Sequence, residues 1–143
     1  MKLYFAYGSN LWREQMRARC PEHRKIGSGV LRGYRWIISA RGYANIVASP
    51  QDLVLGTIYE LSAADEESLD QYEGVAKDSY RKEMLMVEVD GGCGSCLVYV
   101  DPVEEEGKPR EEYVERLNNG IDDARFPAAY VELYLREFVP VAK

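Results

Sequence analysis

Histidine and cysteine, the residues that most often build metal sites and activate nucleophiles, are scarce in this sequence. The 143 residues include one histidine, His23, and three cysteines. A Ser-His or Cys-His mechanism needs a histidine paired with an activated nucleophile, and no serine or cysteine here has such a context. The composition therefore disfavours nucleophilic catalysis by the protein's own side chains.

The three cysteines, Cys20, Cys93 and Cys96, are an odd number, which fits a reducing compartment. Cys93 and Cys96 have C-x-x-C spacing, but structural zinc usually takes four ligands, and the chain offers only Cys20 and His23 besides. The glycines around the pair indicate a hairpin turn between two strands instead. A redox or metal switch at this pair is the alternative, and it predicts bound zinc or a disulfide there.

The sequence also lacks a long apolar run and a basic cluster. No run approaches membrane-spanning length, and the N-terminus reaches the polar turn at Gly8 without room for a secretory hydrophobic region. The formal net charge is -6, and the densest basic stretch, 13–25, is broken by Glu14 and Glu22. We expect a cytoplasmic protein that binds neither nucleic acid nor membrane. The sequence does not indicate an oligomeric state.

The composition and the order of the elements indicate one α+β domain over residues 1–143. Hydrophobic residues make up 46% and charged residues 29%, with no internal repeat or linker, which is typical of a soluble globular domain. A mixed, strongly curled, barrel-like sheet of about six or seven short strands with a few flanking helices is expected. We expect strands over 3–6, 26–41 (joined or bent at Gly33), 46–49, 53–61, 81–89 and 97–100, and helices over 11–19, 62–74, 111–118 and 128–138.

The stretch Tyr7-Gly8-Ser9-Asn10-Leu11 follows a short apolar run and precedes a helical segment. A strand that breaks at a glycine and leads into a helix leaves backbone N–H groups without partners, which suits a carboxylate or an oxyanion. Ser9 and Asn10 are also good N-cap residues, so a capped helix start explains the same pattern. The stretch is thus a candidate anion site, but its sequence alone does not distinguish an anion site from a capped helix start.

Glu73 is placed against the local rules of helix formation. Ser62 begins a helix with an S-x-x-D capping pattern, and Gly74 is a natural C-terminal stop. Glu73 therefore lies at the negative end of the helix dipole and four residues after Leu69, on the face expected to meet the core. Both placements raise the pKa of a carboxylate toward the range of a general base. The alternative is that Glu73 turns outward to pair with Lys77 or Arg81.

Together these residues resemble the γ-glutamylcyclotransferases, in the wider group that includes γ-glutamylamine cyclotransferases and AIG2-like proteins. The resemblance rests on 4–11, on Glu73-Gly74-Val75 and on Tyr80. It continues through 45–50, 56–59 and Tyr113, and so covers nearly the whole chain in order.

The resemblance implies a small enzyme that needs no metal or cofactor, acts on a small-molecule γ-glutamyl substrate, and releases 5-oxoproline with a free amino acid or amine. Glutathione is among the candidate substrates. It implies that Glu73 is the general acid and base, and that the substrate is bound by Tyr4, Phe5, Ala6, Tyr7, Gly8, Ser9, Asn10, Tyr80 and Tyr113. A binding module that kept the pocket without the chemistry is the alternative.

The resemblance leaves the leaving group open among amino acids, amines, isopeptide lysine and biosynthetic intermediates. The pocket wall that meets this group could come from the loop 41–45 or the loop 101–110.

Overall fold

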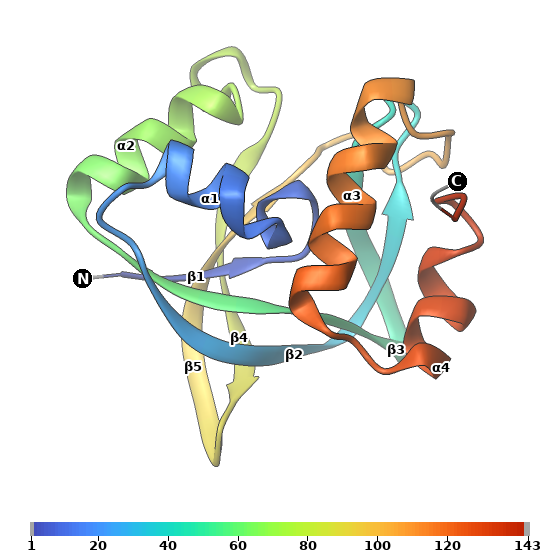
Figure 1. Cartoon of the computed structure of the whole chain (residues 1–143), viewed down its shortest axis with the longest axis horizontal. Helices are drawn as coiled ribbons and strands as arrows, with labels where there is room; N and C mark the ends of the chain where they lie inside the picture. The colour runs from blue at the N-terminus through green and yellow to red at the C-terminus, as the bar shows by residue number, and fades with distance from the viewer. Residues whose placement is uncertain (1, 142–143) are drawn as a thin grey trace.

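The computed structural model describes residues 2–141, which form an α+β fold around a closed five-stranded barrel (Figure 1). The strands pair in the order β1-β3-β2-β4-β5, antiparallel except for the closing contact between β1 and β5. The elements are β1 (Lys2–Ala6), η1 (Ser9–Leu11), α1 (Arg13–Arg19), β2 (Arg24–Ile38), β3 (Ala44–Leu61), α2 (Ala63–Tyr72), η2 (Val75–Lys77), β4 (Arg81–Val89), β5 (Gly92–Val100), α3 (Glu111–Ala124), α4 (Ala128–Tyr130) and η3 (Val131–Leu135).

The predicted α+β class and barrel-like sheet are confirmed, but the predicted strand count of six or seven was too high. The segment 26–41, expected to be joined or bent at Gly33, forms the single strand β2 as far as Ile38, and 46–49 and 53–61 both belong to β3. The ladder between these strands shifts register between Arg32 and Tyr34, where Gly33 has a φ of +86°. A β-bulge bends a strand without ending it and also tolerates a proline such as Pro50.

Two further boundaries differ from the sequence prediction. The hairpin turn expected at 91–96 lies earlier, because Gly92 already pairs with Val89 and Cys93 with Glu88. The helix expected to stop before Gly120 continues to Ala124 as α3. A Cβ atom at Gly120 would lie 2.8 Å from the Leu11 Cβ atom, so this glycine allows α3 to approach η1 closely rather than ending the helix.

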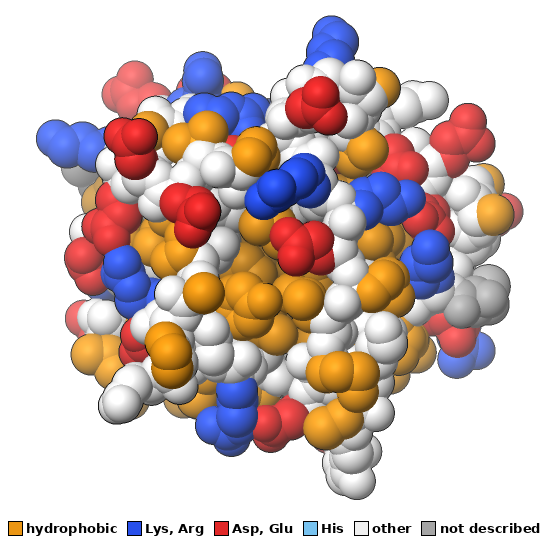
Figure 2. Space-filling model, turned by 180° about the vertical axis from the view of Figure 1, so that it is seen from behind, with side chains coloured by type: hydrophobic (Ala, Val, Ile, Leu, Met, Phe, Trp, Pro, Cys, Tyr) orange, Lys and Arg blue, Asp and Glu red, His pale blue; other side chains and the backbone are white. Residues whose placement is uncertain are grey.

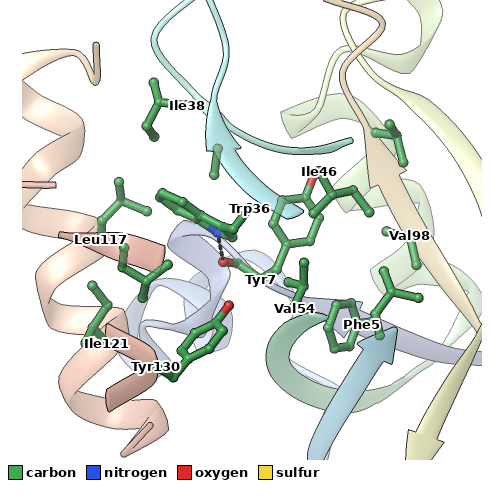
Figure 3. Close-up of a cluster of buried hydrophobic side chains, with 14 of the residues drawn as sticks. Phe5, Tyr7, Trp36, Ile38, Ile46, Val54, Val98, Leu117, Ile121 and Tyr130 are labelled. Carbon is green, nitrogen blue, oxygen red and sulfur yellow. Dashed lines mark hydrogen bonds between the residues drawn. The ribbon is translucent and has the colours of Figure 1, made fainter. Parts of the chain in front are cut away.

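The short strand β1 is buried on both faces, which explains why it reads as a continuous apolar run. Because side chains alternate along a strand, Tyr4 and Ala6 join one core cluster while Phe5 and Tyr7 join the other. The second cluster contains Trp36, whose Nε1–H donates to the Tyr7 carbonyl oxygen at 2.8 Å (Figure 3). β1 therefore delivers its C-terminal end to a defined place between the two clusters.

The helices cover the barrel from two sides (Figure 1). α1 and α2 lie side by side over the cluster that contains Tyr4, and α3 packs against η1. None of the helices in the described part of the chain is both long and apolar enough to cross a membrane.

Large hydrophobic side chains are also exposed at the surface. Seen from behind, hydrophobic side chains gather over the centre of the molecule, with charged side chains around them (Figure 2). The large exposed ones of the whole surface come from β2, α2, β4, η3 and the segment after it, and are Ile26, Tyr72, Met84, Met86, Leu133 and Val141. Single exposed apolar side chains are common on protein surfaces, so these six do not by themselves indicate a docking site.

The close contact between the paired strands β1 and β3 at Gly56 leads to a prediction about stability. A Cβ atom at Gly56 would lie 2.3 Å from the Ala6 carbonyl oxygen and 2.6 Å from the Phe5 ring. We expect Gly56→Ala to lower the free energy of unfolding by about 1–3 kcal/mol, because this backbone contact leaves no room for a methyl group. Urea unfolding measures the change. Gly92→Ala is the matched control, since nothing lies within 4 Å of its added methyl group; equal effects at both positions would contradict the prediction.

Candidate active site

One cavity of about 310 Å³ brings together nine of the ten residues predicted for the site. Its wall includes the loop after β1, the end of α2, and tyrosines from β5 and α3. The predicted residues that line it are Tyr4, Phe5, Tyr7, Gly8, Ser9, Asn10, Glu73, Tyr80 and Tyr113. Residues far apart in the chain thus meet at one hollow.

Ala6 is the predicted residue that does not line the cavity. It is buried, pairs with Thr57 across the β1–β3 ladder, and its carbonyl oxygen faces Gly56. Its side chain belongs to the same core cluster as that of Tyr4, but the short methyl group does not line the cavity.

Nine further residues line the cavity besides the predicted site residues. They are Arg19, Arg41, Tyr43, Ala44, Tyr72, Gly74, Ser79, Tyr99 and Arg116. The loop 41–45 does contribute to the wall, as the sequence suggested, whereas no residue of 101–110 does. Tyr72 is 60% exposed, and the Arg19 guanidinium lies over its ring, 4.4 Å from the ring centre.

Tyr7 anchors the loop at the cavity through its side-chain hydroxyl and its backbone carbonyl. Its hydroxyl donates to the Tyr99 carbonyl oxygen at 2.6 Å, and its own carbonyl accepts from Trp36. The next turn is closed by hydrogen bonds from Leu11 N–H to the Gly8 carbonyl and from Trp12 N–H to the Ser9 carbonyl. The loop is therefore fixed before any ligand binds.

Side chains from α1 fix the polar groups of the same loop. Gln15 Nε2 donates to Ser9 Oγ at 2.8 Å and to Asn10 Oδ1 at 2.9 Å, and Arg19 Nη1 donates to Asn10 Oδ1 at 3.1 Å. Asn10 Nδ2 in turn donates to the Tyr4 hydroxyl at 2.9 Å. The N-cap residues of η1 and α1 are Gly8 and Trp12, and neither helix has a side-chain cap, so the alternative of a helix start capped by Ser9 or Asn10 was wrong.

Two tyrosine hydroxyls meet the backbone of Ala44 on the opposite wall. The Tyr80 hydroxyl donates to the Ala44 carbonyl at 2.9 Å, and the Tyr113 hydroxyl accepts from Ala44 N–H at 3.4 Å. Burial raises the pKa of Tyr113 to about 12 and that of Tyr80 well above its usual value, so both hydroxyls keep their protons. They can act as hydrogen-bonding groups, but not as bases near neutral pH.

The end of α2 places Glu73 at the cavity. Ser62 Oγ accepts from Asp65 N–H at the start of the helix, as the capping pattern predicted. At the other end Glu73 N–H donates to the Leu69 carbonyl at 2.8 Å, and Gly74 takes the left-handed conformation with a φ of +66°. The helix therefore stops where its last side chain faces the cavity.

The carboxylate of Glu73 is in an environment that favours its protonated form. Desolvation by burial raises the pKa of Glu73 to about 7, and the positive charges of Arg19 and Arg41 oppose that rise. Glu73 forms no ion pair in the described part of the chain, so the alternative of an outward pairing with Lys77 or Arg81 was wrong. A carboxyl group with this pKa can take up and return a proton near neutral pH.

The cysteines and the histidine lie outside the cavity. Cys93 is exposed and Cys96 is buried, because residues three apart on a strand point to opposite faces. His23 packs edge-on against Tyr59 and contacts the Arg13 guanidinium at 3.0 Å. Within residues 2–141, no three Cys, His, Asp or Glu side chains gather as metal ligands would.

The raised pKa of Glu73 predicts a pH-dependent stability. Because the folded protein holds this proton more tightly than an unfolded chain of pKa 4.5, the stabilisation is complete below about pH 4.5 and is lost as the pH rises through about 7. We expect the free energy of unfolding of the wild type, relative to that of Glu73→Gln, to decrease as the pH rises from about 4.5 to above 7. Urea unfolding of both proteins at about pH 4.5 and pH 8 measures it; a pH-independent difference would contradict the pKa.

The family model for gamma-glutamyl cyclotransferase, AIG2-like proteins matches residues 4–116. Human gamma-glutamylcyclotransferase is 29% identical over 141 residues, covering 91% of this chain and 75% of its own length; the mouse protein is 30% identical over 144 residues with the same coverage. A solved structure of a gamma-glutamyl cyclotransferase superposes with a TM-score of 0.83 at 27% identity, covering 92% of this chain and 84% of that one. These relatives support the general function of that family for this chain. The chain belongs to the gamma-glutamyl cyclotransferase, AIG2-like family.

Proposed function

We propose that this protein is a γ-glutamylcyclotransferase that acts as one domain over residues 1–143. It would convert a γ-glutamyl compound into 5-oxoproline and a free amino acid or amine, without a cofactor. The observation that carries the proposal is the meeting of Glu73, with its pKa of about 7, and the loop 7–10 in one cavity.

The substrate brings its own nucleophile in this reaction. The α-amine of the γ-glutamyl group attacks the γ-carbonyl carbon, which forms one C–N bond and breaks the C–N bond to the leaving group. A side-chain nucleophile is therefore unnecessary, in agreement with a cavity wall that holds no cysteine or histidine among the described residues. The cavity has to hold the substrate in a folded conformation in which its amine meets its γ-carbonyl. Such positioning can lower the activation barrier of an intramolecular reaction substantially.

Glu73 is the proton carrier of the proposal. In its ionised form it takes a proton from the attacking amine, and it returns the proton to the departing nitrogen. The two protons that the substrate ammonium loses are the two that the released amine takes up as an ammonium ion. The reaction thus needs no water and no external acid.

The loop and the tyrosines position the substrate. Backbone N–H groups around Gly8, Ser9 and Asn10 are proposed to bind the oxygen of the γ-carbonyl, on which negative charge develops during attack. Tyr80 and Tyr113 are proposed to contact the substrate from the opposite wall. Support comes from the hydrogen bonds that fix this loop, since preorganised donors stabilise a developing charge without moving.

Replacing the proposed proton carrier tests the mechanism. Glu73→Gln should fold and abolish the formation of 5-oxoproline, a loss of about a hundredfold or more, because an amide cannot accept the proton. The assay follows 5-oxoproline release from γ-glutamyl amino acids, γ-glutamylamines and glutathione. Glu67→Gln is the matched control, since this exposed glutamate lies on the same helix outside the cavity.

Two outcomes would contradict the proposal. Release of 5-oxoproline by Glu73→Gln at the wild-type rate would remove Glu73 from the mechanism. Binding of γ-glutamyl compounds by the wild type without turnover of any of them would favour a binding module instead.

Filling the loop tests the proposed substrate contact. A Cβ atom at Gly8 would lie 3.0 Å from the Ala44 Cβ atom and 3.1 Å from the Tyr113 hydroxyl. We expect Gly8→Val to raise KM and to lower kcat/KM roughly tenfold or more, because the larger side chain shifts the loop against the opposite wall. Steady-state kinetics with one γ-glutamyl amino acid measures this. An unchanged KM would count against the role of the loop in binding.

A further inference from the structure

Positive charge gathers at the cavity of an acidic protein. The chain has 24 acidic and 18 basic residues, yet three arginines and one carboxylate, Glu73, line the cavity. Arg19 comes from α1, Arg41 from the loop between β2 and β3, and Arg116 from α3. Within the described residues, neither Arg19 nor Arg116 forms an ion pair. The wall is therefore suited to an anionic ligand.

Arg41 is the arginine whose orientation is fixed most firmly. Its Nη1 group donates to the Ser79 carbonyl oxygen at 2.8 Å and to Asp101 Oδ2 at 3.0 Å. Asp101 is fully buried and is itself held by the Ser39 hydroxyl at 2.9 Å. The guanidinium also lies 5.6 Å from the ring centre of Tyr80. One corner of the guanidinium is thus anchored to the protein interior.

The anchored geometry leaves the rest of the guanidinium for a ligand. An arginine carries five N–H donors, and the two on Nη1 account for the contacts with Ser79 and Asp101. The hydrogen bonds of residues 2–141 include none from Nε or Nη2 of Arg41. Two neighbouring N–H groups of a guanidinium form a planar fork that matches the two oxygens of a carboxylate.

We propose that Arg41 binds a carboxylate on the leaving group, so that the cavity selects γ-glutamyl amino acids over γ-glutamylamines. This inference rests on the proposed function, since it concerns the same site and reaction. It adds a residue that determines specificity and the class of leaving group that it accepts.

The balance of charge at the cavity supports this class. Asp101 offsets Arg41, and Glu73 offsets one further arginine when it is ionised, which leaves at least one positive charge on the wall. A γ-glutamylamine has one ammonium and one carboxylate, and so brings no net charge. A γ-glutamyl amino acid carries a second carboxylate and brings one negative charge. The negative charge of the γ-glutamyl amino acid therefore complements the positive charge of the cavity wall. Complementary charge contributes more to specificity than to affinity.

A pair of substrates that differ by the carboxylate tests the inference. γ-Glutamylalanine and γ-glutamylethylamine have the same leaving-group skeleton except for that group. We expect Arg41→Gln to lower the ratio of their kcat/KM values about tenfold to a hundredfold, because a charge-assisted hydrogen bond to the carboxylate is lost. The ratio at one pH is informative because any effect of Arg41 on Glu73 acts on both substrates and cancels.

Two variants separate specificity from folding. Arg41→Gln alone leaves the buried carboxylate of Asp101 without its cation, which destabilises proteins strongly. The double variant Arg41→Gln/Asp101→Asn removes both charges together and should show the same fall in the ratio. Arg32→Gln is the control, since Arg32 pairs with Glu88 at the surface and does not line the cavity; its ratio should equal that of the wild type.

The outcomes distinguish this inference from the proposed function. Equal losses on both substrates in the double variant would overturn the inference, because Arg41 would then serve the γ-glutamyl group or the fold alone, while 5-oxoproline release would still support a cyclotransferase. If the wild type turned over neither substrate, the proposed chemistry would fail. Calorimetric binding of the same two ligands would then decide the inference: an Arg41-dependent preference for γ-glutamylalanine would support it, and no preference would overturn it.

Discussion

The hydrogen bonds of Tyr7 are the constraint on which the candidate site depends. The hydroxyl reaches the Tyr99 carbonyl on β5, and the carbonyl receives the indole N–H of Trp36 on β2, so two further strands of the barrel determine where β1 ends. Both groups are buried, and an unpaired partner in such a place costs about 1–3 kcal/mol. The loop after β1 is thus anchored to the core as well as closed by its own turn hydrogen bonds.

The protonation of Glu73 reflects a balance of opposed effects. Removal from water favours the neutral acid, whereas Arg19 and Arg41 favour the carboxylate. The combination of the two effects places the pKa of Glu73 at about 7, where both forms are populated. The arginines would then have two roles, since the cations that attract an anionic substrate also keep the proton carrier available as a base.

Sequence reasoning predicted the features that depend on local rules. The cap at Ser62, the stop at Gly74 and the exceptional position of Glu73 follow from neighbours within one helix, and the family resemblance was confirmed over the matched residues. The arginines of the wall could not be predicted in this way. Arg41 faces the cavity because Asp101, 60 positions away, holds it there, and no local pattern contains that pairing. The full length of β2 and β3 was not predicted, because the residues at the bulge between them, such as Gly33, are also typical of a break between two short strands.

The closing contact between β1 and β5 has a consequence for association with other chains. Tyr4 pairs with Leu97 there, so the five strands form a ring, and among residues 2–141 the sheet has no outermost strand. Proteins with an open sheet can recruit a further strand through unpaired backbone groups, a route that also leads to fibrils. In this barrel β5 meets β1 at one register pair and β4 meets β2 at two, so association through backbone groups is limited to the rest of the β4–β5 hairpin.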